Sequence, residues 1–349
     1  MSSGGVAKAI AALKAGRPVR INGGTEVTIL PVETAGGELL ELLDPEAKAP
    51  LLISGTRAVA LSLTNLIDAA NPARPVLIER SDWLDAGTAL ALADPGQDLD
   101  RAPIGPLQAI ALSDENLAKS ALTLARAAGL LPALWLINSE DKTVVSLSQD
   151  EPTSLDAPVS LVARAQLPLD DMPETQIAAF RTADGQEHVA LIVGAFGGKR
   201  PLVRMHSECL TGDVFGSLKC DCGPQLHTAL HLIGKEGGGV LLYLRQEGRG
   251  IGLANKLRAY ALQDRGLDTV EANQRLGFAD DERDYADAAA MLHALGIDRV
   301  RLLTNNPAKA EALSAAGIEV VERVAHHMPS NPHNADYLAV KRSKSGHLL

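Results

Sequence analysis

The 349-residue chain contains few aromatic residues and few cysteines. Aromatic residues make up 3% of the sequence, so its cores must consist mainly of Ala, Leu, Val and Ile. The chain also lacks a surplus of positive charge, because 33 Lys+Arg stand against 43 Asp+Glu and give a net charge of −10. A general nucleic-acid binder needs such a surplus to neutralise phosphates, and this function class is therefore excluded.

Long hydrophobic runs are missing as well. The most apolar stretch, residues 51–70, is interrupted by Arg57 and Asp68 and cannot span a bilayer. The first 19 residues lack the basic region and the continuous apolar region of a signal peptide. We therefore expect a protein of the reducing cytoplasm, with neither a membrane nor a nucleic acid as partner.

The three cysteines are Cys209, Cys220 and Cys222. Their odd number argues against a disulfide framework, and all three lie in one short window, RMHSECLTGDVFGSLKCDCG. In an extended backbone Cys220 and Cys222 point to the same face, so both can bind one ion. Three thiolates around Zn²⁺ leave a fourth position for water, which is typical of a catalytic zinc site.

Other interpretations of this window are available. Free cysteines commonly pack as small hydrophobic residues, although this does not explain the neighbouring His206, Glu208, Asp213 and Asp221. A structural zinc site needs a fourth ligand, for which His206 is the nearest candidate. The deaminase pattern H-x-E followed by P-C-x-x-C is matched only in its first part, by His206 and Glu208.

The second half of the chain alternates short apolar runs with helical patterns. GVLLYL reads as a buried strand, and RVRLLT, NNPAKAEALSAAG and IEVVERV read as strand, helix and strand. This alternation predicts an α/β layer structure. Between about 148 and 176 the sequence becomes rich in Pro, Ser and acidic residues, which indicates the connection between two domains.

A glycine-rich segment, QEGRGIG at 246–252, lies between a predicted strand and a predicted helix. Its glycines let backbone N–H groups approach an anion, and the helix N-terminus adds partial positive charge. The segment matches neither common nucleotide-binding glycine motif, and a tight turn alone would also explain it. Basic residues in the same half favour a polyanionic small substrate such as a nucleoside triphosphate; they are Arg204, Arg245, Arg249, Lys256, Arg258, Arg283 and Lys309.

The run from Arg204 to the C-terminus resembles GTP cyclohydrolase II, a zinc enzyme of riboflavin biosynthesis. The resemblance rests on RMHSECLTGD, LKCDCG, YLRQEGRGIGLANKLRAYALQDRGLDTVEAN, LGFADDERDY, RLLTNNPAK and GHLL, which occur in this order. It implies a homodimer and, over residues 165–349, a three-layer α/β/α domain with a mixed sheet. Residues 151–164 would then be a linker that follows an N-terminal domain over residues 1–150.

The resemblance also implies roles for single residues. The three cysteines would hold one zinc ion. Asp281 would be the proton acceptor, Arg283 a nucleophile at the α-phosphorus, and Tyr260 would lie near the guanine ring. Further contacts to GTP would come from Arg204, Met205, His206, Ser207, Glu208, Gln225, Glu247, Gly248, Arg249, Thr269, Thr304 and Lys309.

The implied reaction converts GTP into 2,5-diamino-6-ribosylamino-4(3H)-pyrimidinone 5′-phosphate, formate and pyrophosphate, with Mg²⁺ on the phosphates. Because a guanidinium stays protonated in almost any site, Arg283 could instead clamp the α-phosphate while water attacks. Alternative functions are a cyclohydrolase that stops at a formylated intermediate or uses another purine triphosphate, and a non-catalytic GTP-binding regulator. The regulator is expected to lack a zinc cysteine, Asp281 or Arg283, and all of these are present.

Residues 1–150 resemble 3,4-dihydroxy-2-butanone 4-phosphate synthase through AIAALKAGRPV and LARAAGLLPA, which implies an α+β domain. The acid-rich Mg²⁺-binding loop of that family is replaced here by RINGGTEVTILPV, and its G-H-T-E motif falls on residues 116–119, which read NLAK. Without the carboxylates and the histidine the synthase reaction has no machinery. We expect an inactive domain kept for folding, dimer contacts or regulation.

Overall fold

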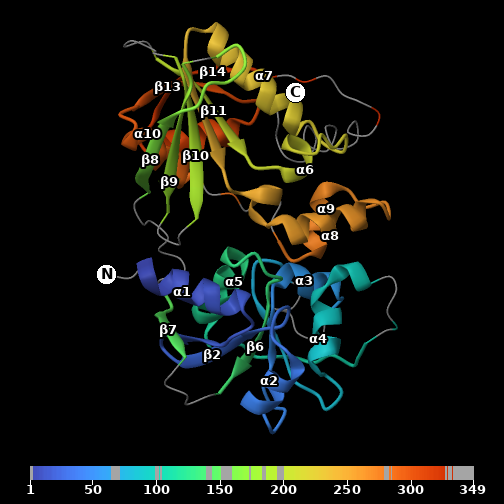
Figure 1. Cartoon of the computed structure of the whole chain (residues 1–349). Helices are drawn as coiled ribbons and strands as arrows, with labels where there is room; N and C mark the ends of the chain where they lie inside the picture. Colours follow the sequence, from blue (N-terminus) through green and yellow to red (C-terminus); the bar gives the residue numbers. More distant parts are fainter. Residues whose placement is uncertain are drawn as a thin grey trace. The chain divides into compact units, whose positions relative to one another are not determined.

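A computed structural model describes residues 3–63, 71–98, 102, 104–138, 144–150, 159–172, 174–182, 186–194, 200–278, 283, 285–326, 328 and 332. The chain forms two compact units. Unit 1 comprises Met1–Leu155 and Ala254–Glu282, and unit 2 comprises Asp156–Leu253 and Arg283–Leu349. Figure 1 shows the chain and labels many of its helices and strands.

Unit 1 is built on a seven-stranded sheet in the order β5-β4-β3-β6-β2-β1-β7. Strands β1 and β7 are parallel, and every other neighbouring pair is antiparallel, so the sheet is mixed. The strands are β1 (Val19–Asn22), β2 (Glu26–Pro31), β3 (Leu51–Ile53), β4 (Val76–Ile78), β5 (Ala109–Ile110), β6 (Ala133–Ile137) and β7 (Val145–Ser148).

Helices α1 and α5 pack against this sheet because each has one apolar face. Leu13 of α1 and Ala121 of α5 are completely buried in one cluster with Ile21 and Ile29 of the sheet. Helix α1 ends at Lys14, and Gly16 follows two residues later with a φ of 69°. The helices of unit 1 are α1 (Ser3–Lys14), α2 (Gly37–Leu43), α3 (Gly55–Ala60), α4 (Ala86–Ala93), the short η2 (Pro95–Gln97), α5 (Glu115–Ala127), α8 (Leu253–Gln263) and α9 (Thr269–Arg275).

Unit 2 also contains a seven-stranded mixed sheet, in the order β14-β13-β11-β12-β10-β9-β8. The four strands β14, β13, β11 and β12 run parallel, and β10, β9 and β8 continue the sheet in antiparallel fashion. The strands are β8 (Ser160–Gln166), β9 (Gln176–Arg181), β10 (Glu187–Val193), β11 (Leu202–Ser207), β12 (Gly239–Leu244), β13 (Arg299–Leu303) and β14 (Glu319–Val324).

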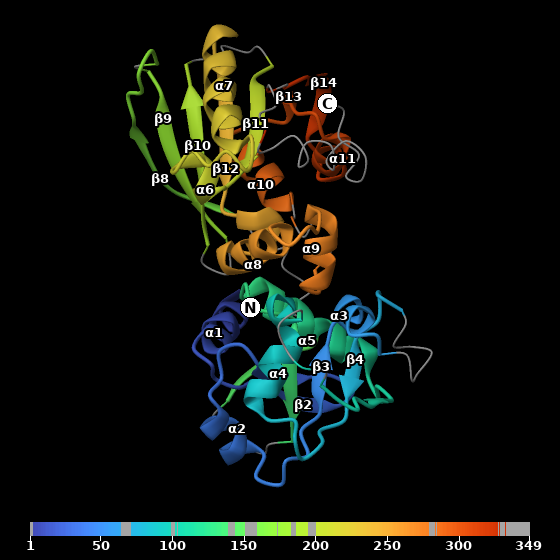
Figure 2. The ribbon, with the colours of Figure 1, turned by 90° about the vertical axis from the view of Figure 1, so that its right-hand side faces the viewer.

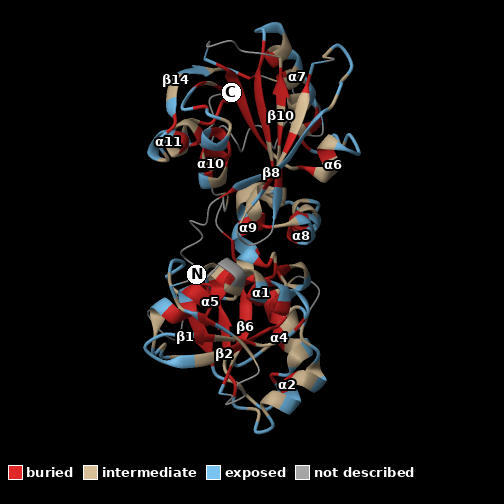
Figure 3. Cartoon of the chain, turned by 60° about the vertical axis from the view of Figure 1, so that its left-hand side comes forward, coloured by how far each residue is buried: buried red, intermediate tan, exposed pale blue. Residues whose placement is uncertain are grey.

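Helices cover both faces of the second sheet, as Figures 2 and 3 show. Successive side chains of a strand point to opposite faces, so Leu241 packs with Ile233 of α7 whereas Leu242 packs with Met291 of α10. The expected α/β class with a mixed, three-layered second part is therefore confirmed. The helices of unit 2 are α6 (Leu210–Asp213), α7 (Cys222–Lys235), the short η4 (Glu247–Gly250), α10 (Ala286–Ala294) and α11 (Pro307–Ala315).

The boundaries 1–150, 151–164 and 165–349 stay a prediction. Residues 151–158 of the expected linker lie outside the described residues, and its last part contains the start of β8 at Ser160. Within the described part of the chain, no helix is long and apolar enough to cross a membrane.

Candidate functional site

The carboxyl ends of three parallel strands carry most of the residues singled out in the sequence. Strand β11 ends at Ser207, β12 at Leu244 and β13 at Leu303. Cys209, the glycine-rich segment and Thr304 each follow one of these ends. Because ligands of open α/β sheets bind outside the carboxyl ends of parallel strands, this edge of unit 2 is the place to expect a site.

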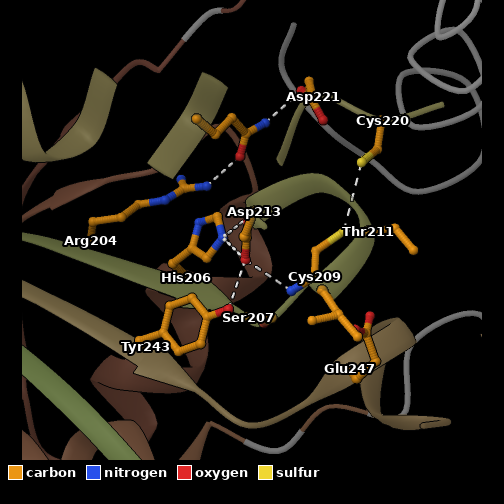
Figure 4. Close-up of polar contacts among 12 residues, drawn as sticks. Arg204, His206, Ser207, Cys209, Thr211, Asp213, Cys220, Asp221, Tyr243 and Glu247 are labelled. Carbon is orange, nitrogen blue, oxygen red and sulfur yellow. Dashed lines mark hydrogen bonds and ion pairs between the residues drawn. The ribbon is translucent and has the colours of Figure 1, made fainter. Parts of the chain in front are cut away.

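The three cysteines converge at this edge. Their Sγ atoms all lie within 4.8 Å of one another, and the Sγ atoms of Cys209 and Cys220 are 3.7 Å apart. Cys209 directly precedes α6, and Cys222 is the first residue of α7. Figure 4 shows Cys209 and Cys220 facing each other. The predicted clustering of the three thiols is thus confirmed.

Two glycines allow the sulfur atoms to approach. A Cβ atom on Gly212 would lie 2.8 Å from the Cys220 sulfur and 3.1 Å from the Cys209 sulfur. A Cβ atom on Gly223 would lie 2.4 Å from the carbonyl oxygen of Gly212. Any larger residue at Gly212 would occupy the space on which the sulfurs converge, so the backbone is shaped around the cluster.

The pKa values of two thiols in this cluster, Cys220 and Cys222, are raised. Hydrogen bonding with Cys209, together with burial, raises the pKa of Cys220 to about 11, and hydrogen bonds to both neighbouring cysteines raise the pKa of Cys222. A divalent cation favours the thiolate form, and soft thiolates prefer Zn²⁺ over Mg²⁺ or Ca²⁺. Three converging cysteines therefore indicate a zinc site.

Asp213 fixes the backbone beside this cluster. Its carboxylate accepts hydrogen bonds from the backbone N–H of Cys209 at 3.0 Å and from the Tyr243 hydroxyl at 2.9 Å. The Nε2 atom of His206 lies 3.1 Å from both carboxylate oxygens, and the His206 ring stacks on Tyr243 with centroids 5.6 Å apart. Burial lowers the pKa of His206, which favours a neutral ring that donates its Nε2–H to Asp213. Figure 4 shows this network.

Arg204 is held by neighbours on two sides. Its Nη1 donates to the carbonyl oxygen of Leu303 at 3.0 Å, and its Nη2 donates to the side-chain oxygen of Gln225. The amide of Gln225 in turn donates to Asp221, which directly precedes Cys222. Burial lowers the pKa of Arg204 to about 10, so the guanidinium stays charged at neutral pH. The network thus connects a buried cation of β11 with the start of α7.

The Tyr285 ring contacts two further cationic side chains. Lys309 Nζ lies 5.4 Å and the Arg283 guanidinium carbon 5.6 Å from the centre of the Tyr285 ring, within the range of cation–π attraction. Lys309 Nζ also donates to the carbonyl oxygen of Met205 at 2.9 Å, and Arg283 Nη1 donates to the Ser207 hydroxyl at 3.4 Å. Two positive side chains are thereby brought to the end of β11, where they can bind an anion.

The glycine-rich segment forms the short η4 after β12. Gly248 has a φ of 65°, and Arg249 follows with a φ of 63°, which is unusual for a residue with a side chain. Glu247 accepts hydrogen bonds from the backbone N–H groups of Gly248 at 2.9 Å and Leu210 at 2.8 Å. Glu247 therefore ties the glycine-rich segment to the first turn of α6, next to Cys209.

Two aromatic residues of this region were missed by the reasoning from sequence. Tyr243 stacks on the His206 ring, and Tyr285 contacts the cationic groups of Arg283 and Lys309. The sequence patterns assigned no role to either tyrosine. Their scarcity was an available signal, since the whole chain has four tyrosines.

The structure places most predicted site residues in unit 2. Tyr260 lies in α8 and Thr269 is the first residue of α9, so both belong to unit 1. Asp281 lies outside the described residues. The predicted residues in unit 2 are Arg204, Met205, His206, Ser207, Glu208, Cys209, Cys220, Cys222, Gln225, Glu247, Gly248, Arg249, Arg283, Thr304 and Lys309.

Comparison with known proteins decides the family. The family model described as GTP cyclohydrolase II matches residues 160–325. A GTP cyclohydrolase-2 of Azospirillum brasilense is 42% identical over 365 residues, which cover 99% of this chain and 94% of the relative. The chain belongs to the GTP cyclohydrolase II family. It is accordingly an enzyme of that family, and its three clustered cysteines agree with a zinc site.

Further similar proteins match different shares of the chain. The riboflavin biosynthesis protein RibBA of Cytophaga hutchinsonii is 43% identical over 294 residues, 75% of this chain and 72% of the relative. A GTP cyclohydrolase-2 of Enterobacter sp. strain 638 is 57% identical over 189 residues, 54% of this chain and 96% of the relative. A solved structure of RibBX, a two-domain 3,4-dihydroxy-2-butanone 4-phosphate synthase from A. baumannii, is 19% identical with a TM-score of 0.32, covering 91% of this chain and 98% of its own.

Proposed function

We propose that this chain hydrolyses GTP to 2,5-diamino-6-ribosylamino-4(3H)-pyrimidinone 5′-phosphate, formate and pyrophosphate. The observation that carries the proposal is the convergence of three cysteine sulfurs within 4.8 Å at the carboxyl edge of a family-matched sheet. A zinc ion bound there by Cys209, Cys220 and Cys222 would supply a Lewis acid that lowers the pKa of water. Two hydrations at C8 of guanine then open the ring and release formate.

The surrounding side chains keep the cluster rigid. Asp213 holds the backbone N–H of Cys209 and the Tyr243 hydroxyl, and it fixes the plane of the His206 ring. Glu247 holds the first N–H of α6. Such supporting hydrogen bonds orient metal ligands and typically tune metal affinity and activity. These residues therefore position the cysteines, while Tyr260 is proposed to lie against the guanine ring and Asp281 to accept a proton.

The phosphates of GTP are proposed to bind to the cations gathered at the end of β11. Mg²⁺ enters with the phosphates, since it is bound mainly through phosphate oxygens and water. The Arg283 guanidinium lies beside the Tyr285 ring and donates to the Ser207 hydroxyl. The Lys309 ammonium group also contacts the Tyr285 ring. A guanidinium fixed in this way suits a clamp on the α-phosphate better than a nucleophile, because it stays protonated.

One assay tests the proposal. The purified chain is incubated with GTP, Zn²⁺ and Mg²⁺, and formate, pyrophosphate and bound zinc are measured. We expect Cys222→Ser to abolish formate release and to lose zinc, because one of three ligands is removed. Val214→Ser is the matched control, since Val214 is 65% exposed in the same window and should leave both readouts unchanged.

Formate also separates the alternative reactions. A cyclohydrolase that stops early would open the ring but retain the formyl carbon in its product. Full formate release by Cys222→Ser would contradict the proposed zinc chemistry, and absence of formate from the wild-type chain would contradict the proposed reaction.

For residues 1–150 we propose a domain without synthase activity, and for the whole chain a homodimer. The N-terminal proposal is supported by the replaced acid-rich loop, which forms β1, a glycine turn and β2. Formation of the butanone phosphate from ribulose 5-phosphate by the purified chain would contradict it. Sedimentation equilibrium tests the homodimer.

A further inference from the structure

Part of the family-matched region belongs to unit 1. Residues 254–278, called here the α8–α9 segment, share a compact unit with the first 155 residues, and α9 lies beside α3 (Figure 1). The segment has a buried apolar side that includes Leu262, Leu276 and Phe278, each 2% exposed or less. It therefore contributes to the core of unit 1 and is more than a surface loop.

A buried ion pair meets the end of α9. Arg57 is 1% exposed, donates to both carboxylate oxygens of Asp98 at 2.7 Å, and reaches the carbonyl oxygen of Arg275 at 3.4 Å. Arg275 in turn lies 3.7 Å from Asp98. The last carbonyl groups of a helix carry partial negative charge, so a fixed cation there stabilises the end of α9. A Cβ atom on Gly277 would come within 2.5 Å of the Ser54 hydroxyl, so the helix end lies directly on α3.

Helix α8 is held by a second set of contacts. Arg258 pairs with Glu33 at 2.9 Å and with Asp94 at 3.6 Å. Asn255 is fully buried, and its amide donates to the carbonyl oxygen of Gly129 at 3.2 Å. Arg258 also donates to the side-chain oxygen of Asn255 at 2.8 Å, which joins the two anchors. Both ends of the segment are thus fixed by charged or buried polar groups.

These contacts lie at the opposite end of α5 from the replaced synthase motifs. Gly24 of the glycine turn lies beside Asp114, the N-cap of α5, because a Cβ atom there would be 3.6 Å from the Asp114 carboxylate. Gly129 follows the C-terminus of α5, and 13 residues of helix span about 20 Å. Loss of the acidic loop therefore leaves the contact surface for α8 and α9 intact.

We propose that residues 1–155 act as a positioning domain for the α8–α9 segment, with Glu33 and Arg57 as positioning residues. The inference rests on the proposed function, in which this segment presents Tyr260 and Thr269 to GTP. Glu33 acts through Arg258, two residues before Tyr260, and Arg57 acts through the end of α9. The Enterobacter relative, which matches 54% of this chain and 96% of its own length, is too short to contain both units.

The test uses the full chain with Glu33→Gln, which removes the charge that faces Arg258 and keeps a side-chain oxygen for the N–H of Leu131. Hydrogen–deuterium exchange of residues 254–278 and steady-state kinetics with GTP are measured. Because a hydrogen bond to a charged group is lost, we expect exchange to rise about tenfold and the KM for GTP to rise about three- to tenfold, with a smaller change in kcat.

Further variants make the test specific. Asp44→Asn breaks the buried Arg80–Asp44 pair, whose side chains are 7% and 11% exposed, in the same unit but away from the segment. It should leave exchange in 254–278 and the KM for GTP at wild-type values. Glu33→Gln combined with Arg258→Gln should raise both values no further than Arg258→Gln alone, because Glu33 acts through Arg258, whereas the effects of two independent folding defects would add.

The outcomes separate the inference from the proposed function. Unchanged exchange in 254–278 of Glu33→Gln would overturn the positioning role, and so would faster exchange with wild-type KM and kcat. Additive effects of Glu33→Gln and Arg258→Gln in the combined variant also count against it. If the wild-type chain releases no formate from GTP, the proposed function fails, whereas the exchange measurement still reports whether Glu33 holds the segment.

Discussion

The two units share an architecture but differ in their chemistry. Each has a seven-stranded mixed sheet with helices, and each keeps its own apolar core. Three cysteines, two tyrosines and the buried cations Arg204 and Lys309 gather where the parallel strands of unit 2 end, whereas the places in unit 1 where we expect the synthase motifs hold a glycine turn and the residues NLAK. If unit 1 lacks synthase activity, as proposed, function depends on the residues that follow the strands rather than on the sheet.

The largest effect is expected at Gly212, in the unit that carries the cysteines. Gly212→Ala places a methyl group 2.8 Å from the Cys220 sulfur, so the cysteines must move apart. We expect zinc affinity and formate release to fall roughly 10- to 100-fold, as for other groups that support a metal site. Gly36→Ala in unit 1, where an added Cβ atom meets nothing within 4 Å, is the control. Equal activity of the two variants would mean that the cluster does not depend on this close approach.

The next largest effect is on the free energy of unfolding. It compares a buried ion pair of unit 1 with a surface ion pair of unit 2. Arg57→Ala leaves the 9%-exposed carboxylate of Asp98 without its main partner, so the free energy of unfolding should fall by about 3 to 5 kcal/mol. Urea unfolding followed by circular dichroism measures it. Arg299→Ala in unit 2 breaks a surface pair with Glu319, and we expect no resolvable change. A similar loss of unfolding free energy in both variants would contradict the expected difference between the buried pair and the surface pair.

The smallest effect is a helix cap of unit 1. The Asp85 carboxylate accepts the backbone N–H of Thr88 at 2.7 Å, and this hydrogen bond lowers the pKa of Asp85. The folded state thus favours the ionised form, and the resulting stability is present above the unfolded pKa near 4 and disappears as the pH falls through the folded value. Asp85→Ala should cost about 1 kcal/mol at pH 7 and less at pH 2 in urea titrations. Asp82→Ala, which replaces an exposed acid three residues earlier, is the control and should leave the free energy of unfolding at pH 7 unchanged.

Local patterns predicted a large part of the site from sequence. The cysteine window predicted a metal cluster because its three thiols are close along the chain, and the apolar run GVLLYL predicted the buried strand β12. The end of α1 was predictable because Gly16, with its positive φ, follows Lys14 closely and a positive φ favours glycine.

Long-range contacts were not predictable in the same way. Tyr243 and Asp213 are 30 residues apart, and Arg57 and Arg275 are 218 residues apart, so no periodicity brings them together. The α8–α9 segment reads as a continuation of the cyclohydrolase motifs, although it shares a compact unit with the first 155 residues. Its anchors are single charged residues, and on a helix such residues usually indicate only a solvated face.

The interrupted chain order of unit 1 has a consequence for protein synthesis. Its first piece ends at Leu155 and its second piece ends at Glu282, so 127 residues must be added before the unit has all its parts. At 5–20 residues per second this takes about 6 to 25 s. During that interval the nascent N-terminal domain exposes the surface that later receives α8 and α9. The part of unit 2 that carries the cysteines therefore leaves the ribosome before unit 1 is complete.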